Sequence, residues 1–183
     1  MVTAFVGLGG NLDGPQQRVL RALRRLARLP GVRLSGASSL YRSPPLTAPG
    51  VPPQDPYVNA VARLETGLDP QTLLELLHAV EAEQGRRRTA ARWGPRTLDL
   101  DLLLYGEARL ETPDLVLPHP ELHRRAFVLY PLAEIDPEAR VPGLGGVAAL
   151  LAGVDTAGLT RIAPAPAPER SVPHGGGAVD GGW

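Results

Sequence analysis

Residues 86–106, RRRTAARWGPRTLDLDLLLYG, contain the strand around which we arrange the predicted fold. Asp99 and Asp101 alternate with leucines in it, which is the pattern of a strand with one polar and one buried face. Side chains two residues apart in a strand point the same way, about 7 Å apart at a rise of roughly 3.3 Å per residue. The two carboxylates therefore share one face, and we predict a strand over 97–104.

The segments before this strand predict three further strands and two helices. The runs that we assign to strands lie at 2–8, 32–42 and 57–64. The helices lie at 15–29 and 70–84, each with proline in its first turn, and Asp69 precedes the second as its N-cap. The resulting order, β-α-β-β-α-β, is the split-βαβ or ferredoxin-like pattern. We therefore predict an α+β fold in which helices cover one face of an antiparallel sheet, and another face or edge stays open for a ligand.

Two regions differ in composition from the rest. Residues 43–56 contain six prolines, which excludes ordinary helix or central strand and indicates a functional loop. The last residues are rich in proline and glycine and have almost nothing to bury, so we predict a disordered tail over 163–183. Short helices are expected after Pro120, over 127–135 and over 143–154. Residues 1–162 form one predicted domain.

Composition excludes several function classes. The 183 residues carry 19 Lys and Arg against 19 Asp and Glu, so no overall field favours nucleic acid or a membrane surface. All of the basic residues are arginine, which rules out a phosphate loop that requires lysine. Cysteine is absent, which excludes disulfides and cysteine-ligated metals. The N-terminus does not resemble a secretory signal and no apolar run reaches membrane-spanning length, so we expect a cytoplasmic protein.

The arginines beside Asp99 and Asp101 allow two interpretations. They could be a solvated charged face beside an ordinary strand, which is the more common origin of such a run. They could also form a site for a polyphosphate and its metal ions, because guanidinium groups bind phosphate oxygens bidentately and Mg²⁺ takes carboxylate and phosphate oxygens. Gly94 and Pro95 place the arginines on a loop, where Trp93 could pack in the core or stack on a base. From the residues alone, both interpretations remain open.

The run Arg92-Trp93-Gly94-Pro95-Arg96-Thr97-Leu98-Asp99-Leu100-Asp101 resembles the signature of the 6-hydroxymethyl-7,8-dihydropterin pyrophosphokinase family. Further similar motifs are VGLGGNL at 6–12, YRSPP at 41–45, YVN at 57–59, LPHP at 117–120 and RAFVL at 125–129, so that the resemblance extends over about residues 2–155. It implies transfer of pyrophosphate from ATP to the hydroxymethyl group of a reduced pterin, with release of AMP. It also implies a ferredoxin-like fold, in agreement with the order of elements.

The resemblance assigns the charged residues to ATP and its metal ions. Asp99 and Asp101 are expected to bind two Mg²⁺ ions, with ATP as co-substrate. Catalysis is expected from these aspartates together with Arg86 and Arg96, which would hold the migrating phosphates. The residues expected to bind ATP are Glu81, Arg88, Arg92, Trp93, Arg96, Leu102 and His119.

For the pterin, the resemblance assigns an aromatic pair and a polar edge. Tyr57 and Phe127 match the residues that sandwich the ring, and Asn59 offers both a donor and an acceptor to its amide-like edge. The full set expected to bind the pterin is Ser43, Pro44, Leu46, Tyr57, Asn59, Trp93 and Phe127. The expected partners are thus two small molecules, with no nucleic acid and no membrane, and we expect a monomer.

The sequence departs from the family pattern at a few places. Gly10 and Ser43 stand where serine and threonine are common, and the loop over 47–56 is longer and richer in proline, which bears on closure of the site.

Two other protein classes match parts of the sequence. An RNA-binding module shares the topology but would show aromatic residues on its sheet and a basic face. A D-x-D transferase with one metal would use the aspartates but leaves Tyr57 and Asn59 unexplained.

Overall fold

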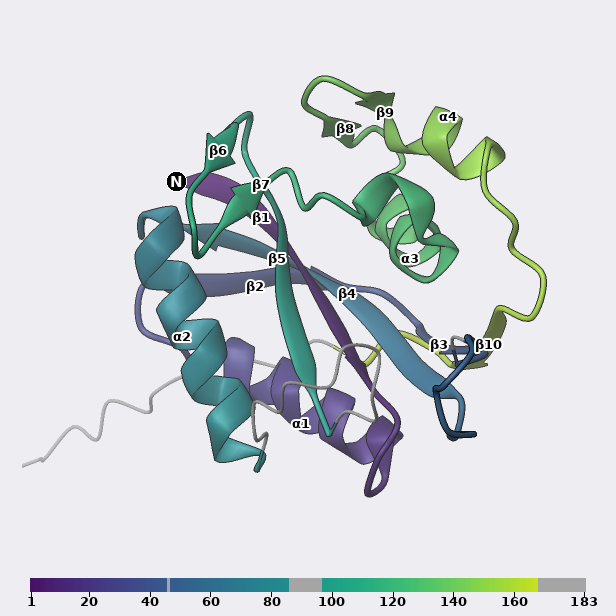
Figure 1. Cartoon of the computed structure of the whole chain (residues 1–183). Coiled ribbons are helices and arrows are strands. Elements are labelled where there is room, and N and C mark those ends of the chain that lie inside the picture. The colour runs from purple at the N-terminus through teal and green to yellow at the C-terminus, as the bar shows by residue number, and fades with distance from the viewer. Residues whose placement is uncertain (46, 86–96, 168–183) are drawn as a thin grey trace, which may run out of the picture.

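The structure, a computed structural model, describes residues 1–45, 47–85 and 97–167. Its centre is a six-stranded sheet in which all paired strands are antiparallel, with the order β10-β3-β4-β1-β5 and with β2 also paired to β4 (Figure 1). The strands are β1 (Val2–Gly10), β2 (Val32–Ala37), β3 (Leu40–Ser43), β4 (Tyr57–Thr66), β5 (Asp99–Tyr105) and β10 (Thr160–Ala163). The predicted α+β class with an antiparallel sheet is confirmed.

Helices lie on both faces of this sheet. They are α1 (Pro15–Leu26), α2 (Pro70–Glu83), α3 (Ala126–Ile135) and α4 (Val147–Ala152), with a 3₁₀ turn η1 (Leu122–Arg124) before α3. Figure 1 shows α1 and α2 on one face and α3 on the other, with α4 against α3. Two small hairpins lie outside this sheet: β6 (Leu110–Glu111) pairs with β7 (Val116–Leu117), and β8 (Arg140–Val141) pairs with β9 (Gly145–Gly146). The second face of the sheet is therefore covered in part by α3.

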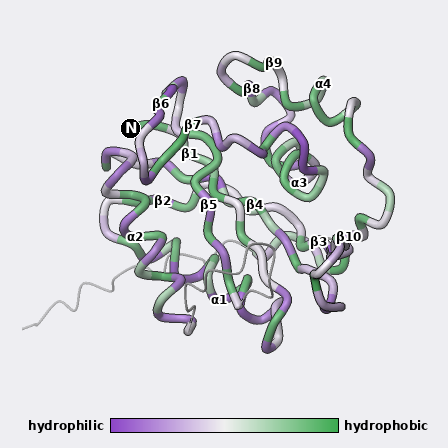
Figure 2. The backbone as a smooth tube through the Cα atoms, in the orientation of Figure 1, coloured by the Kyte–Doolittle hydropathy of each residue, from purple (hydrophilic) through white to green (hydrophobic). Residues whose placement is uncertain are grey.

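Each face of the sheet has its own buried core. On β4, Ala60 and Leu64 enter the core beneath α1 and α2, while Val61 enters the core beneath α3. Leu100 of β5 lies in the core beneath α1 and α2. Asp99 and Asp101, on either side of Leu100, therefore point to the face on which α3 packs. Hydrophobic and hydrophilic residues alternate along α1 and α2, as expected for helices with one buried side (Figure 2).

The predicted strand over 32–42 is two strands, because the chain is interrupted at Ser38. The Ser38 backbone N–H donates to Val61 O at 2.9 Å, and Ser38 Oγ accepts from the Val61 N–H at 2.9 Å. A side-chain oxygen thus replaces a backbone carbonyl in the ladder and ends β2. β3 then pairs with the start of β4, and its register places Tyr41 opposite Asn59 and Ser43 opposite Tyr57.

The ends of the helices follow the signals in the sequence. Thr72 N–H donates to Asp69 Oδ1 at 3.0 Å at the start of α2, with Pro70 in its first turn, so the predicted N-cap is confirmed. No pattern in the sequence predicts β10, which ends at Ala163, the first residue of the predicted tail. Within the three described ranges, no helix is long and apolar enough to cross a membrane.

Candidate active site

Three neighbouring strands bring predicted site residues into one row. In the register of the sheet, Gly9 on β1 lies opposite Asn59 on β4 and also opposite Asp99 on β5. Gly7 likewise lies opposite Asp101. Directly opposed residues carry their side chains on the same face. The amide and the two carboxylates therefore share the face on which α3 packs, away from α1 and α2.

Glycines leave the sheet surface between Asn59 and the two aspartates free of side chains. A Cβ on Gly9 would lie 3.0 Å from Asn59 Oδ1, which is tighter than nine in ten real Cβ contacts. A Cβ on Gly7 would meet the Leu103 side chain at 3.5 Å, an ordinary contact. Glycine inside a strand weakens it and marks a place where a ligand or another backbone approaches closely. The alternating glycines of β1 are therefore a signal for the site that can be read in the sequence.

Asp99 and Asp101 offer oxygen ligands at the margin of the sheet. Both residues are half-buried, and β5 is the last strand in the sheet order. In the part of the chain that the structure describes, no group of three or more Asp, Glu, His or Cys side chains could enclose a metal ion. Two carboxylates without a third protein ligand suit Mg²⁺, which keeps water and substrate phosphates in its other positions.

His119, on the loop after β7, lies within reach of the charge of Asp101. Its backbone N–H donates to Leu103 O at 2.9 Å, which holds this loop against β5. Its Nδ1 accepts from the Glu121 N–H at 3.2 Å. Burial lowers the pKa of His119; the charge of Asp101 opposes this shift and that of Arg125 adds to it. A neutral imidazole that accepts at Nδ1 carries its proton on Nε2, and this nitrogen can donate to a phosphate oxygen.

The two predicted ring-binding residues come from the sheet and from the helix above it. Tyr57 begins β4 and, two residues before Asn59, presents its side chain to the same face. Phe127 lies in the first turn of α3. Both residues are half-buried, and the guanidinium of Arg125 lies 5.7 Å from the centre of the Phe127 ring. The two rings thus come from elements that pack on each other.

Two residues predicted to bind ATP have buried side chains. Glu81 is 2% exposed, and its Oε1 accepts from the Leu100 N–H at 2.7 Å. This bond reaches the backbone of β5 between Asp99 and Asp101. The Leu102 side chain lies in the core beneath α1 and α2, so only its backbone remains for a ligand.

Ser43 and Pro44 lie at the end of β3, next to Asn59. Ser43 is buried and Pro44 is exposed, and Asn59 Nδ2 donates to Ser43 Oγ at 2.7 Å. The remaining predicted site residues lie outside the described residues: Leu46, Arg86, Arg88, Arg92, Trp93 and Arg96.

Sequence reasoning missed a polar anchor for the proline-rich loop. Asn11 Nδ2 donates to Gln54 Oε1 at 3.0 Å and to Asp55 O at 2.9 Å. The Tyr57 hydroxyl donates to the same Gln54 oxygen at 3.3 Å. The turn after β1 is thus tied to the residues that lead into Tyr57. Asn11 stands in the motif at 6–12, but nothing in the sequence reveals its partner, which lies 43 residues away.

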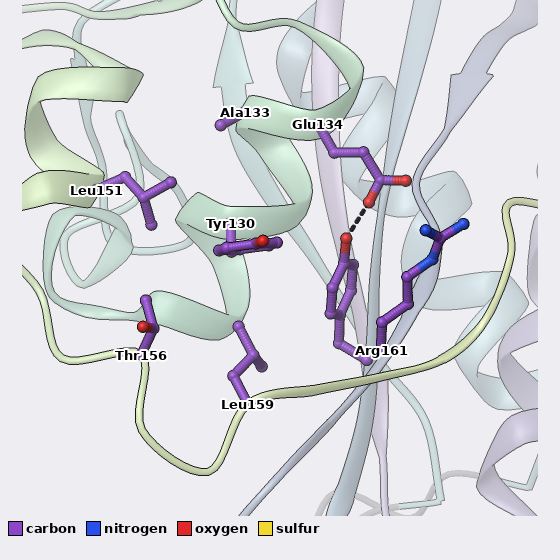
Figure 3. A pocket seen from close by; sticks show the side chains of 8 residues that line it. Tyr130, Ala133, Glu134, Leu151, Thr156, Leu159 and Arg161 are labelled. Carbon is purple, nitrogen blue, oxygen red and sulfur yellow. Dashed lines mark hydrogen bonds between the residues drawn. The ribbon is translucent and has the colours of Figure 1, made fainter.

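A cleft of about 640 Å³ lies beside this row and includes none of the predicted site residues (Figure 3). It is lined by Tyr41, Tyr130, Ala133, Glu134, Leu151, Thr156, Leu159 and Arg161. Glu134, which faces it, already accepts hydrogen bonds from Ser39 and from the Tyr41 hydroxyl. The Tyr41 ring also packs edge-on against Tyr130, with ring centres 5.4 Å apart. We therefore regard this cluster as a structural joint between α3 and β3.

The chain matches a known protein family. The family model described as 7,8-dihydro-6-hydroxymethylpterin-pyrophosphokinase matches residues 5–137. A curated protein of Pseudomonas aeruginosa, named 2-amino-4-hydroxy-6-hydroxymethyldihydropteridine pyrophosphokinase, is 48% identical over 158 residues, which are 86% of this chain and 95% of that protein. Proteins of the same name from Haemophilus influenzae and Methylorubrum extorquens are 45% and 41% identical, over 78% and 88% of this chain and 86% and 99% of their own lengths.

Solved structures show the same fold. The chain aligns with the crystal structure of Plasmodium falciparum HPPK-DHPS with pteroate at a TM-score of 0.65 and 12% identity. The alignment covers 83% of this chain and 42% of that one, so this chain spans less than half of the solved protein. A second structure, of HPPK-DHPS in complex with substrates, aligns at a TM-score of 0.64 and 11% identity, over 83% of this chain and 43% of that chain.

Proposed function

The chain belongs to the 7,8-dihydro-6-hydroxymethylpterin-pyrophosphokinase family, and we propose that Asn59, Gly9, Asp99 and Asp101 form the centre of its active site. The enzyme transfers pyrophosphate from ATP to 6-hydroxymethyl-7,8-dihydropterin, which yields AMP and the pterin diphosphate in folate biosynthesis. One observation carries the proposed site: the register of β4, β1 and β5 sets an amide suited to a heterocycle beside two carboxylates suited to a metal.

Asp99 and Asp101 would hold two Mg²⁺ ions together with the phosphates of ATP. Support comes from their shared face, their half-buried position and the absence of side chains on the neighbouring Gly7 and Gly9. When bound, Mg²⁺ neutralises charge on the phosphate oxygens and on both the entering and the leaving oxygen of an in-line displacement. A site with only two carboxylates also leaves room for a triphosphate among the metal ligands.

The reaction requires the hydroxymethyl oxygen of the pterin to attack the β-phosphorus of ATP. The bond from this phosphorus to the oxygen of AMP breaks, and the hydroxyl proton is released. Positioning and charge stabilisation do most of the work in such transfers. His119 Nε2 would donate to a phosphate oxygen from the side of Asp101. Arg86, Arg88, Arg92 and Arg96, predicted from the sequence, would supply the remaining positive charge, and Trp93 would cover the substrates.

The pterin would lie between Tyr57 and Phe127, with Asn59 at its amide-like edge. Aromatic rings on two facing elements suit a flat heterocycle. Backbone groups of Ser43, Pro44 and Leu46 would bind the rest of that edge. Asn11 would act indirectly, because it fixes Gln54 and thereby the hydroxyl of Tyr57.

We also propose a fold class, a cellular location, an oligomeric state and a number of metal ions for this protein. The sheet order supports classing the core as ferredoxin-like, since β1-α1-β2/β3-β4-α2-β5 is the split-βαβ sequence of elements. The absence of cysteine supports a cytoplasmic location. A site built from the strands of a single chain supports a monomeric enzyme. Two carboxylates alone fit one Mg²⁺ ion as well as two. We therefore propose the second ion in addition to the first.

A product assay tests the activity. The purified protein is incubated with ATP, Mg²⁺ and 6-hydroxymethyl-7,8-dihydropterin, and the products are separated by anion exchange and identified by mass. We expect AMP and the pterin diphosphate in equal amounts, and no product when Mg²⁺ is chelated. ADP with a pterin monophosphate, or ATP consumption that does not depend on the pterin, would contradict the proposal.

A further inference from the structure

We propose that the Ser43 hydroxyl and Gly9 together orient the Asn59 amide, and that this orientation selects the pterin edge that the site accepts. Ser43 and Gly9 would be positioning residues, which act on the ligand through Asn59. The inference rests on the proposed role of Asn59 in pterin binding and adds to it the reason why that amide presents one pattern of donor and acceptor.

The first constraint is a hydrogen bond at the end of β3. Asn59 Nδ2 donates to Ser43 Oγ at 2.7 Å, and both residues are 5% exposed. The two are diagonal neighbours on one face, because Ser43 lies opposite Tyr57 in the register. One amide hydrogen is therefore used within the protein. Among the described residues, no other hydrogen bond uses this amide, so its second hydrogen and its oxygen remain for a ligand.

Gly9 supplies the second constraint, which decides between the two orientations of the amide. A serine hydroxyl can donate as well as accept, so it would tolerate either one. The position of a Cβ on Gly9 is 3.0 Å from Asn59 Oδ1, so the oxygen end of the amide faces Gly9 Cα. Hydrogens on Cα make weak favourable contacts with oxygen. A turned amide would instead press its NH₂ group against them.

β3 can hold the hydroxyl in place because its other end is anchored to α3. Glu134 accepts from the Ser39 N–H at 2.8 Å and from the Ser39 hydroxyl at 2.7 Å. It also accepts from the Tyr41 hydroxyl, a bond drawn as the dashed line to Glu134 in Figure 3. Tyr41 and Ser43 lie on the same face of β3, two residues apart. The Ser43 hydroxyl is thus fixed between the anchor at Glu134 and the pairing with β4.

The orientation has a chemical consequence for the substrate. The amide-like edge of a pterin carries a ring N–H donor beside a carbonyl acceptor. An oriented amide matches both, since its oxygen accepts from the N–H and its NH₂ donates to the carbonyl. In the 4-amino analogue, donor and acceptor are exchanged, and the matching amide would have to be turned over. The contact with Gly9 sets the orientation only while the bond to Ser43 holds the amide in line with Gly9 Cα. Without the Ser43 hydroxyl, Asn59 is free to turn and accept the analogue.

A matched pair of variants isolates the hydroxyl. Ser43→Thr keeps a hydroxyl oxygen and introduces the residue that is common at this position in the family. Ser43→Val introduces a side chain with the shape of threonine but with a methyl group in place of the hydroxyl. The measured quantity is the ratio of kcat/KM for 6-hydroxymethyl-7,8-dihydropterin to that for its 4-amino analogue. We expect Ser43→Thr to keep the wild-type ratio and Ser43→Val to lower it about five- to tenfold, the effect of one net hydrogen bond. The KM for ATP should not distinguish the two variants.

Three outcomes separate the possible failures. Equal ratios in Ser43→Thr and Ser43→Val would overturn the positioning role while leaving the proposed function intact. A wild-type ratio in Asn59→Ala would overturn this inference together with the pterin-binding role of Asn59. Absence of pterin turnover in the wild type would overturn the proposed function itself. Thermal melting checks that each variant is folded, and Ser43→Ala serves as a smaller hydroxyl-free variant if Ser43→Val does not fold.

Discussion

At the scale of single residues, Asp101 is where the metal ligands and the phosphate-binding groups of the proposed site meet. It shares a face of β5 with Asp99, and its charge acts on His119. We expect Asp101→Asn to lower kcat by about two orders of magnitude or more, because an amide is a much weaker Mg²⁺ ligand and leaves charge in the transition state uncompensated. Turnover measured over a Mg²⁺ titration checks this.

The matched control for this substitution is Asp114→Asn, which removes an exposed carboxylate outside the row. It should leave both kcat and the Mg²⁺ dependence unchanged. Pterin affinity without ATP, measured by fluorescence titration, should be similar in all three proteins. An Asp101→Asn enzyme with kcat within tenfold of the wild type would remove Asp101 from the metal site.

Glu81 offers a second prediction at this scale, because its hydrogen bond suggests a role in positioning β5. Glu81→Gln keeps an oxygen that can accept from the Leu100 N–H, whereas Glu81→Ala leaves this N–H without that partner. An unsatisfied buried donor costs about 1–3 kcal/mol, so urea denaturation should show a loss of this size for Glu81→Ala. Glu81→Gln should lose less. A Glu81→Gln enzyme that is as stable as the wild type but inactive would instead support direct binding of ATP or its metal by the carboxylate.

The sequence allows some of these residue positions to be predicted and hides others for a physical reason. The shared face of Asp99 and Asp101 follows from the two-residue period of a strand, which is local. The contact of Ser43 with Asn59 depends on the register between β3 and β4, which is set by the whole sheet. The bond from Glu81 to Leu100 depends on how α2 packs, and therefore cannot be predicted from the period of either element.

At the scale of elements, Glu134 joins α3 to β3 through bonds that depend on its charge. Partial burial raises the pKa of Glu134, but the hydrogen bonds from Tyr41 and Ser39 outweigh it and leave the pKa below its usual 4.5. Since the folded-state pKa is the lower one, the stabilisation is complete above pH 4.5 and is lost as the pH falls through the folded-state value. Burial and the bond to Glu134 raise the pKa of Tyr41 above 10.0, so its contribution is lost as the pH rises past 10.0.

Glu134→Gln tests this titration because glutamine does not lose a charge in acid. We expect the difference in the free energy of unfolding between wild type and Glu134→Gln to be constant from about pH 5 to 9 and to shrink below about pH 4. Denaturation in urea across this pH range measures it. A difference that does not change with pH would mean that the charge of Glu134 contributes nothing to the joint.

Most helices and strands could be predicted because their signals are local. The prolines at the starts of α1 and α2, the Asp69 N-cap and the alternation of β4 are all visible in the sequence. The division of 32–42 into β2 and β3 could not be predicted, because Ser38 acts through a hydrogen bond to Val61 on another strand. β10 has only four residues and is defined by its pairing with β3, so its signal is not local either.

At the scale of the whole molecule, β10 is the last strand of the residues that the structure describes. It pairs with β3 at the end of the sheet opposite β5. Truncation after Ala167 keeps β10 and should leave the melting temperature within about 2 °C of the full chain. Truncation after Gly158 removes β10 and exposes the edge of β3, so we expect a fall of about 5 °C or more. Scanning fluorimetry of the two truncated proteins provides the comparison, and equal melting temperatures would show that β10 adds no stability.

The α+β class of the whole molecule could be predicted from the order of its elements. The packing of α3 on the second face of the sheet could not. The expected open face is partly covered by α3, whose residues pack on Val61 and Leu103. Nothing in the sequence of α3 specifies which sheet face it covers. The row of Asn59, Gly9 and Asp99 lies on this same face, with Asn59 two residues before Val61 on β4, and only the folded molecule reveals this placement.

The position of β5 at the end of the sheet has a consequence for solubility. A terminal strand presents backbone groups that can pair with another molecule and seed aggregation. Here Glu81 occupies the Leu100 N–H, and the backbone N–H of His119 occupies the Leu103 carbonyl. Two residues of the proposed site thus also block the strand against intermolecular pairing. Damage to this part of the protein would favour self-association as well as loss of turnover, and light scattering of concentrated Glu81→Ala would separate the two effects.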